Sequence, residues 1–417
     1  MIVMGGIVGA GIFMNPSEVA HRVHTPALIL GVWALGGVLA LFGAFIWAEL
    51  ATRLPGAGGQ YLYLREAWHP AVAFLYGWVL LLVTQTGGMA AVAVTFAAYF
   101  RRLAGVPWDD RGTAAAVLLV LTAINCFGAR AGSNVQSALM LLKTGAIAAL
   151  VAVGLAFGGH AAAAPAVEPA AGWGLLRAIG AAMVPIAFAY GGWQTATFVA
   201  GEMRDARRDL SRGLIAGVAA VVVLYLAVNL VCLRVLGPGG LDRTSTPASE
   251  VMRIALGERG AQWIAVGIAI STLGFLSQGM LTAPRVYYAM ARDGVFFEHV
   301  GRISRGSGAP VTAIVVQGIL AAAIACSGKY GEILNFEVTV DFISFGMTAA
   351  ALFVLRRRRP AGEGIYRAPG HPYTTGIFVL SCAGIVGSAI AASPANSAIA
   401  LGILAAGVPV YWYWARR

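Results

Sequence analysis

The sequence predicts an all-α membrane protein of twelve transmembrane helices, arranged as a five-plus-five inverted repeat with two further helices at the C-terminal end. Three observations support this fold class. Hydrophobic residues make up 59% of the chain and charged residues 11%, whereas about a quarter of the residues are charged in soluble globular domains. Long uncharged apolar runs recur along the chain. Two of these runs are interrupted by glycine and proline, which weaken helices.

A transmembrane helix needs about 20 apolar residues, and runs of this kind divide the chain from end to end. The expected spans are 1–22, 26–50, 70–100, 113–128, 133–157, 176–203, 212–235, 260–284, 310–327, 332–355, 374–391 and 397–415, with interruptions in the first and the sixth. No soluble domain is left over, so we expect one integral membrane domain over 1–417. Within it, 1–158 is the first inverted repeat, 176–357 the second, and 374–415 the two peripheral helices.

Arginine and lysine residues flank the apolar runs. They are more numerous in one set of alternate connections, which includes Arg356 to Arg359. By the positive-inside rule this richer side is cytoplasmic, so we expect a multi-pass protein of the cell (inner) membrane with both termini in the cytoplasm. The net charge of +11 therefore indicates orientation in a lipid bilayer and not a nucleic-acid partner.

The four cysteines, Cys126, Cys232, Cys326 and Cys382, each lie in an apolar run without paired spacing. No histidine pairs with a cysteine or aspartate at ligand spacing, so we expect no disulfide framework, no metal and no other cofactor. The first apolar run has no basic region ahead of it, which argues against a cleavable signal peptide. Only eight residues precede Gly9, or about 12 Å of helix and less than half a bilayer, so we expect that the natural start lies upstream of Met1 or that the chain is shortened.

The stretch from Gly5 to Pro16 combines a membrane-helix composition with residues that weaken a helix. Gly5, Gly9 and Gly11 lower helix stability, and Pro16 removes a backbone donor. An interrupted helix exposes N–H and C=O groups, which membranes tolerate only where they are buried in protein or line a cavity. The stretch therefore indicates a binding site. The alternative is a face of small residues for close helix packing.

The sixth span carries a second interruption, with Pro185, Gly191 and Gly192 inside an otherwise apolar helix. It follows the first by five spans, so the two interruptions occupy corresponding positions in two inverted halves. Paired interruptions of this kind indicate the binding site of a secondary transporter. Amides at a helix N-terminus suit a carboxylate, and unwound carbonyls suit an ammonium. One such site can bind a zwitterionic amino acid without a charged side chain.

Six stretches in loops and spans carry distinctive motifs: Gly9 to Phe13, Leu54 to Tyr61, Phe188 to Trp193, Glu202 to Leu210, Arg285 to Gly294 and Tyr366 to Pro372. In this order they resemble the amino acid, polyamine and organocation transporter superfamily, and its L-type amino acid transporter branch matches best. The resemblance covers nearly the whole chain. It implies the leucine-transporter fold and sodium-independent exchange, here of neutral L-amino acids.

The resemblance also implies which residues bind the substrate. They are the amides of Gly9, Ala10 and Gly11 for the carboxylate, the carbonyls of Ile7, Phe188 and Gly191 for the ammonium, and Gly192 and Gln194 beside them. Phe188 would also form an aromatic gate over the site. Many relatives have serine in place of Ala10 and asparagine in place of Gln194, so the preferred side chain of the substrate stays open.

Lys143 is the most informative charged residue. It lies ten residues into the span that begins near Ser133, or about 15 Å deep, close to the centre of the bilayer. A buried ammonium is costly and marks a functional site, and the alternative is a structural pairing with backbone carbonyls. By the resemblance, a lysine in the fifth span takes the place of the sodium ion of sodium-coupled relatives. We therefore expect transport that does not depend on sodium.

Four of the acidic residues in the spans bear on function. Glu337 and Asp341 are four residues apart and share a helical face. One interpretation is that Asp341 favours an amine or takes part in proton coupling. The preferred interpretation is a feature of the outer vestibule or an acid at a helix start. Glu49 and Glu202 lie at inner span ends, where we expect solvated or capping roles.

Other functions compete with neutral exchange. A proton-coupled amino acid symporter and an antiporter of cationic amino acids or polyamines are the alternatives. An intramembrane enzyme is disfavoured because the sequence has no Ser/Lys dyad and no His-Glu-x-x-His motif. A channel is disfavoured because no repeat would build a ring of ligands. The expected partners are an amino acid substrate and the lipid bilayer. No disulfide-linked accessory subunit of the kind found in some animal relatives is expected, because the connection from Arg101 to Thr113 contains no cysteine.

Overall fold

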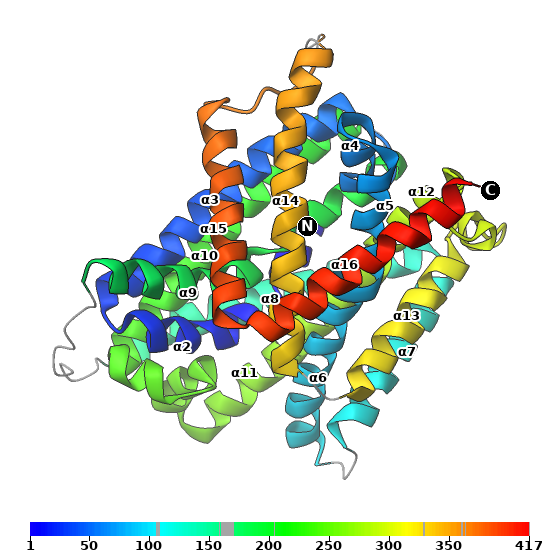
Figure 1. The fold of residues 1–417 in the computed structure, drawn as a ribbon. Coiled ribbons are helices and arrows are strands. Elements are labelled where there is room, and N and C mark those ends of the chain that lie inside the picture. Colours follow the sequence, from blue (N-terminus) through cyan, green and yellow to red (C-terminus); the bar gives the residue numbers. More distant parts are fainter. Residues whose placement is uncertain are drawn as a thin grey trace.

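The computed structural model describes residues 1–105, 109–157, 171–203, 205–327, 330–359 and 364–416, together with Gly159 and Gly362. Every regular element in this part of the chain is helical (Figure 1). Helices α14, α15 and α16 lie next to one another on the near side of the bundle in this view. Arg204, which belongs to one of the family motifs, lies outside the described residues, as do residues 106–108 of the cysteine-free connection.

The predicted spans without an interruption form long helices. They are α3 (Pro26–Arg53), α7 (Asp110–Cys126), α8 (Ala129–Phe157), α10 (Ala206–Arg243), α11 (Pro247–Thr282), α13 (Val311–Ser327), α14 (Tyr330–Arg358), α15 (Tyr373–Ala392) and α16 (Pro394–Ala415). Among the described residues, nine helical stretches are long and apolar enough to cross a membrane, and α13 is apolar but shorter. The count of twelve and the inverted repeat stay predictions.

The first and sixth spans are discontinuous, where glycine and proline predicted it. The first consists of α1 (Ile2–Ile7) and α2 (Gly11–Val23), and the sixth of α9 (Trp173–Tyr190) and the 3₁₀ helix η2 (Trp193–Glu202). The two broken spans contact each other along both parts, since α1 packs against η2 and α2 against α9. This pairing brings both interruptions to one place inside the bundle.

The third span contains a deviation that the sequence did not predict. Between α5 (Pro70–Val79) and α6 (Gln85–Ala104), a π-helical turn, η1 (Leu80–Thr84), inserts an extra residue into the helix. The Thr86 hydroxyl donates to the Leu81 carbonyl at 2.6 Å, which gives that carbonyl a partner within the widened turn. Such π-turns inside α-helices often mark functional sites.

Short polar elements at the ends of the bundle were also not predicted. They are α4 (Gln60–Ala67), α12 (Pro284–Arg292) and the 3₁₀ helix η3 (Glu298–Gly301). Helices α10 and α11 extend beyond the predicted spans through kinks at Gly237 and Gly257, whose φ angles are 67° and 69°. Apolar runs in a sequence mark only the part of a helix that faces lipid or the protein core, so they do not predict its polar extensions.

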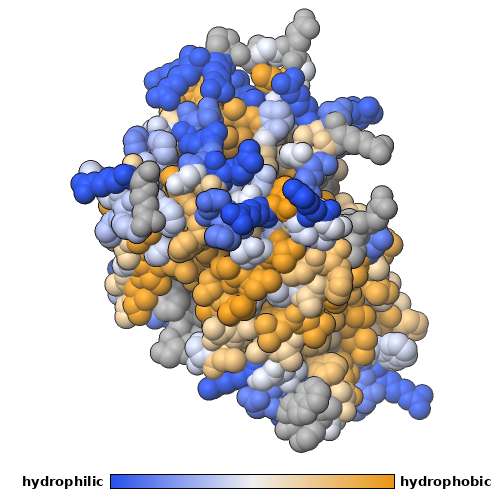
Figure 2. All heavy atoms as spheres, turned by 90° about the vertical axis from the view of Figure 1, so that its right-hand side faces the viewer, coloured by the Kyte–Doolittle hydropathy of each residue, from blue (hydrophilic) through white to orange (hydrophobic). Residues whose placement is uncertain are grey.

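The surface agrees with a membrane location. Figure 2 shows hydrophobic residues in a broad band across the middle of the visible face and hydrophilic residues towards both ends. Large apolar side chains are exposed on several helices, among them Trp263 on α11 and Leu380 on α15. Exposed apolar surface of this extent is unusual for a soluble monomer and is expected where lipid covers it.

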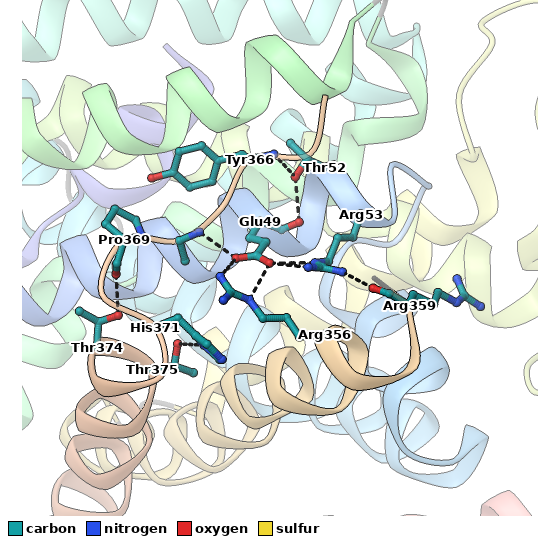
Figure 3. A network of polar contacts seen from close by, with 11 residues as sticks. Glu49, Thr52, Arg53, Arg356, Arg359, Tyr366, Pro369, His371, Thr374 and Thr375 are labelled. Atoms are coloured by element: carbon teal, nitrogen blue, oxygen red, sulfur yellow. Dashed lines mark hydrogen bonds and ion pairs between the residues drawn. The ribbon is translucent and has the colours of Figure 1, made fainter. Parts of the chain in front are cut away.

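The arginine-rich end of the bundle is organised around Glu49 at the end of α3 (Figure 3). Its carboxylate is fully buried and accepts hydrogen bonds from Arg53, from Arg356 at the end of α14 and from the amide of Ala368. The distances from the carboxylate oxygens to these donors are 2.6 to 2.9 Å. The expected solvated role for Glu49 was therefore wrong, because two of its partners, Arg356 and Ala368, come from segments 307 and 319 residues away in the chain. Glu202, in contrast, is half-exposed and pairs with Arg285.

Replacing Glu49 by glutamine should destabilise the protein. The amide leaves the buried guanidinium of Arg53 and that of Arg356 without a counter-charge, and breaking a buried pair in this way costs roughly 3–5 kcal/mol. Thermal unfolding of the purified protein in detergent, followed by size-exclusion chromatography, should show a clearly lower midpoint. Glu298→Gln is the control, because its partner Arg302 is exposed and the midpoint should not move. Equal midpoints for both variants would contradict a structural role for the network.

Candidate functional site

The interruption of the first span leaves backbone groups without helical partners. Val8 has an extended conformation, and α2 begins directly after Ala10. An N-terminal cap needs a side-chain acceptor for the first amides of a helix, and alanine has none. These amides and the positive end of the helix dipole therefore face the interruption. A helix end of this kind is a natural anion site.

The interruption of the sixth span is formed by two glycines. Gly191 is extended, and Gly192 has a φ angle of 100°, which L-residues with a side chain rarely adopt. The side-chain oxygen of Gln194 accepts a hydrogen bond from the Gly192 amide at 3.0 Å. The hydroxyl of Thr195 donates to the Gly192 carbonyl at 2.6 Å. The chain thus turns sharply while its polar groups keep partners.

The two interruptions touch through backbone atoms. A Cβ atom built on Gly192 would lie 2.1 Å from the carbonyl oxygen of Gly6, and one built on Gly6 would lie 2.5 Å from the carbonyl oxygen of Gly192. Both distances are far below any allowed contact, so the two positions require glycine. This contact fixes α1 against the start of η2.

Pro185 creates a further gap that α2 fills. A proline lacks the N–H that would bind the carbonyl four residues earlier, which here belongs to Ala181. The guanidinium of Arg22 donates to that carbonyl at 3.2 Å. The amide of Asn15 donates to the carbonyl of Pro185 itself at 2.7 Å. Side chains of α2 therefore complete the hydrogen bonds of α9.

Lys143 on α8 is fully buried and lies against the interruption of the first span. Its ammonium donates to the carbonyl of Gly5 at 2.9 Å and to the carbonyl of Val8 at 2.6 Å. The side chain thus bridges the end of α1 and the unwound residue beyond it. The expected structural pairing of Lys143 with backbone carbonyls is present, and these carbonyls belong to residues next to those that line the cavity.

Two other carbonyls of this segment have side-chain donors. The hydroxyl of Tyr225 donates to the Ile7 carbonyl, and the hydroxyl of Ser271 donates to the Gly9 carbonyl, both at 3.2 Å. The carbonyl of Phe188, one of the predicted ammonium ligands, accepts from the Gly191 amide at the same distance. A carbonyl oxygen has two lone pairs, so Ile7 and Phe188 each keep one acceptor position.

A central cavity lies between the interruptions. All eight residues that the sequence assigned to substrate binding line it: Ile7, Gly9, Ala10, Gly11, Phe188, Gly191, Gly192 and Gln194. Lys143 does not line the cavity but lies behind the wall that the first span forms. Phe188, the predicted gate, is half-buried. The sequence therefore predicted the residues of one continuous cavity, while their role in binding stays a prediction.

Glu337 and Asp341 line the same cavity. The expected helix-start position was wrong, because α14 begins at Tyr330 and both acids lie well inside it, while the outer-vestibule role stays a prediction. Gly88 on α6 leaves room for the carboxylate, since a Cβ atom there would lie 2.9 Å and 3.0 Å from the two oxygens of Glu337. The acids face the broken helices from the α14 side.

Sequence reasoning missed several residues of the cavity wall, which are Thr84, Gln85, Phe275, Gln278, Phe342 and Phe345. Gln278 on α11 donates to the hydroxyl of Thr195 at 2.6 Å and so supports the interruption of the sixth span. Polar residues in apolar spans were the available signal for Thr84, Gln85 and Gln278. The aromatic residues are indistinguishable from core residues in the sequence.

Comparison with known proteins agrees with this site. The model of the amino acid permease family matches residues 1–413. The serine/threonine exchanger SteT of Bacillus subtilis is 28% identical over 100% of this chain and 95% of its own length. The b(0,+)-type amino acid transporter 1 of Mus musculus is 29% identical over 88% of this chain and 77% of its own length. The large neutral amino acids transporter small subunit 2 of Homo sapiens is 27% identical over 100% of this chain and 79% of its own length.

The family match covers both interruptions, the lysine behind them and the acids across the cavity, so the resemblance seen in the sequence motifs is confirmed. This chain belongs to the amino acid permease family, in the L-type branch of the amino acid, polyamine and organocation superfamily.

Proposed function

We propose that this protein is a sodium-independent exchanger of neutral L-amino acids that works by alternating access. The observation that carries the proposal is the ammonium of Lys143, which binds the carbonyls of Gly5 and Val8 inside the protein. The unwound carbonyls of a broken membrane helix are the groups that coordinate sodium in sodium-coupled carriers. A covalently attached cation at this place removes the need for a soluble one.

The cavity suits the two charged groups of an amino acid. The amides of Gly9, Ala10 and Gly11 at the start of α2 would bind the carboxylate, because they are uncapped and lie at the positive end of a helix dipole. The free acceptor positions on the carbonyls of Ile7, Phe188 and Gly191 would bind the ammonium, with Gly192 and Gln194 completing the site. The names of the serine/threonine and large neutral amino acid relatives support a neutral side chain.

Contacts at the arginine-rich end support alternating access. Arg285 on α12 pairs with Glu202 at the end of η2 at 2.8 Å, and Arg65 on α4 pairs with Asp293 at 2.5 Å. Tyr61 also donates to Asp293 at 2.8 Å. The first pair holds the end of the sixth span to α12, and the contacts of Asp293 hold α4 to the end of α12, so opening this side would require them to break. By its arginine content we place this end, with both termini, in the cytoplasm at the inner membrane.

We further propose that the carrier acts as a transporter and not as an enzyme, and that it works without a disulfide-linked accessory subunit. The connection between α6 and α7 has no cysteine, and the exposed Cys326 lies in α13, at the end of a different connection. Equal activity of the purified single chain with and without a reductant would support this independence.

Counterflow in proteoliposomes tests the transport function. Liposomes loaded with an unlabelled amino acid should take up the same labelled amino acid transiently above equilibrium, with saturation and without chemical change. Uptake should be the same in sodium and in choline buffers. Stimulation by sodium would contradict the role given to Lys143. Absence of counterflow for every amino acid in a full panel would overturn the proposed function.

Replacing Lys143 by alanine should abolish exchange or slow it by more than tenfold. The change leaves two buried carbonyls without a donor, and each unpaired buried group costs about 1–3 kcal/mol. Initial rates of counterflow for folded, monodisperse protein provide the measurement. Gly145→Ala is the matched control on the same helix, since a Cβ atom there meets no other atom within 4 Å. A Lys143→Ala variant with the rate of the control would refute the prediction.

Gly192→Ala should also abolish exchange. The added methyl group would collide with the Gly6 carbonyl oxygen, and the φ angle of 100° disfavours any side chain. Substrate binding by the detergent-solubilised variant, measured by calorimetry beside the Gly145→Ala control, should be lost. Wild-type affinity would mean that the contact between the two interruptions does not shape the site.

A further inference from the structure

We propose that Glu337 and Asp341 bind one positive charge that crosses the membrane with each amino acid. With a neutral amino acid this charge is a proton on the acid pair, and with a basic amino acid it is the side-chain cation of the substrate. The proposal rests on the proposed function, because it adds a co-transported proton and a second substrate class to the same cavity.

The cavity wall has an unbalanced charge. Glu337 and Asp341 are the ionisable side chains among its lining residues in the described part of the chain, and no lysine, arginine or histidine faces them there. The buried cation Lys143 donates to carbonyls behind the opposite wall. Of the other titratable groups, the phenol of Tyr76 on α5 is within electrostatic reach of Asp341, and it carries no positive charge.

The side chain of Glu337 has little space and no counter-charge beside it. Its carboxylate fits against the backbone of α6 only because position 88 is glycine. The Oε2 atom is buried and has no hydrogen-bond partner among the described residues. A carboxylate oxygen removed from water without a partner is unstable, and two carboxylates in one enclosed space repel each other. The pair therefore needs a positive charge in the closed state of the carrier.

An independent feature on the facing helix indicates a ligand at this place. Thr84 lines the cavity from the π-turn η1, which packs against α14. Its side chain is only 4% exposed, and its hydroxyl has no partner among the described residues. A buried hydroxyl normally has a hydrogen-bond partner. A proton-bearing carboxyl or a substrate ammonium beside Glu337 would supply one.

The proton is taken up and released in a balanced way. On the side where the cavity is open, a carboxylate oxygen of the pair gains a proton from water, and the neutral amino acid binds to the broken helices. After the cavity opens on the other side, the O–H bond breaks and the proton leaves to water with the amino acid. A basic amino acid brings its own charge, so it binds to the deprotonated pair.

The two substrate classes should respond to pH in opposite directions. Raising the pH removes the proton from the pair, so exchange of labelled L-serine should fall by up to about tenfold per pH unit once the pair deprotonates. Exchange of labelled L-lysine should rise over the same range. Heteroexchange of internal lysine for external serine should be electroneutral, so a potassium diffusion potential should not change its rate.

The variants separate this proposal from a structural role. Glu337→Gln and Asp341→Asn keep the shape of each side chain. Serine exchange by either variant should lose its fall at high pH, and lysine exchange should drop at least tenfold. Glu298→Gln, an exposed acid outside the cavity, should retain both wild-type profiles. If a cavity variant does not fold, the two pH profiles of the wild type still decide.

The outcomes also distinguish the two proposals. Serine exchange that does not change with pH, together with no lysine exchange, would overturn the charge-binding role and leave the amino acid exchanger intact. A voltage-dependent rate of serine–lysine heteroexchange would likewise overturn it. Failure of every amino acid to exchange would overturn the proposed function instead.

Discussion

Backbone amides and carbonyls cannot remain unpaired in the hydrocarbon core, and this constraint explains most of the architecture around the cavity. Two spans give up their helical hydrogen bonds at the same place, and side chains from three other helices, α8, α10 and α11, supply partners. Lys143, Tyr225 and Ser271 serve the first span, and Gln278 supports the sixth through Thr195. Some backbone amides and carbonyl acceptor positions stay unpaired and face the cavity, where a zwitterion can form hydrogen bonds with them.

Opposite charges are kept apart in this site. The uncapped start of α2 favours an anion on one wall, and two carboxylates favour a cation on the α14 wall. Neither wall neutralises the other, because the buried ammonium of Lys143 is engaged with carbonyls outside the cavity. The separation leaves a field across the cavity that orients a dipolar substrate, and no direct ion pair has to be broken before the substrate binds.

The sequence predicted the parts of this site that depend on local chemistry. Glycine and proline marked both interruptions, and the depth of Lys143 in its span followed from counting residues. The burial of Glu49 was hidden, because its partners Arg356 and Ala368 are distant in the chain. The helix-start interpretation of Glu337 and Asp341 was wrong because α14 begins at Tyr330, and no capping signal in the sequence marks that start. The close contact between Gly6 and Gly192 depends on how the first and sixth spans pack, so it could not be predicted from the local sequence.

The π-turn at Leu80–Thr84 determines what the deletion of one residue in the third span would do. One residue corresponds to about 100° of rotation along a helix, and the widened turn contains one residue more than a regular turn. Deleting any of its five residues would yield an ordinary helix that still crosses the bilayer. It would also rotate Gly88 away from Glu337 on α14. A single-residue deletion here would therefore alter the contents of the cavity and not the fit to the lipid.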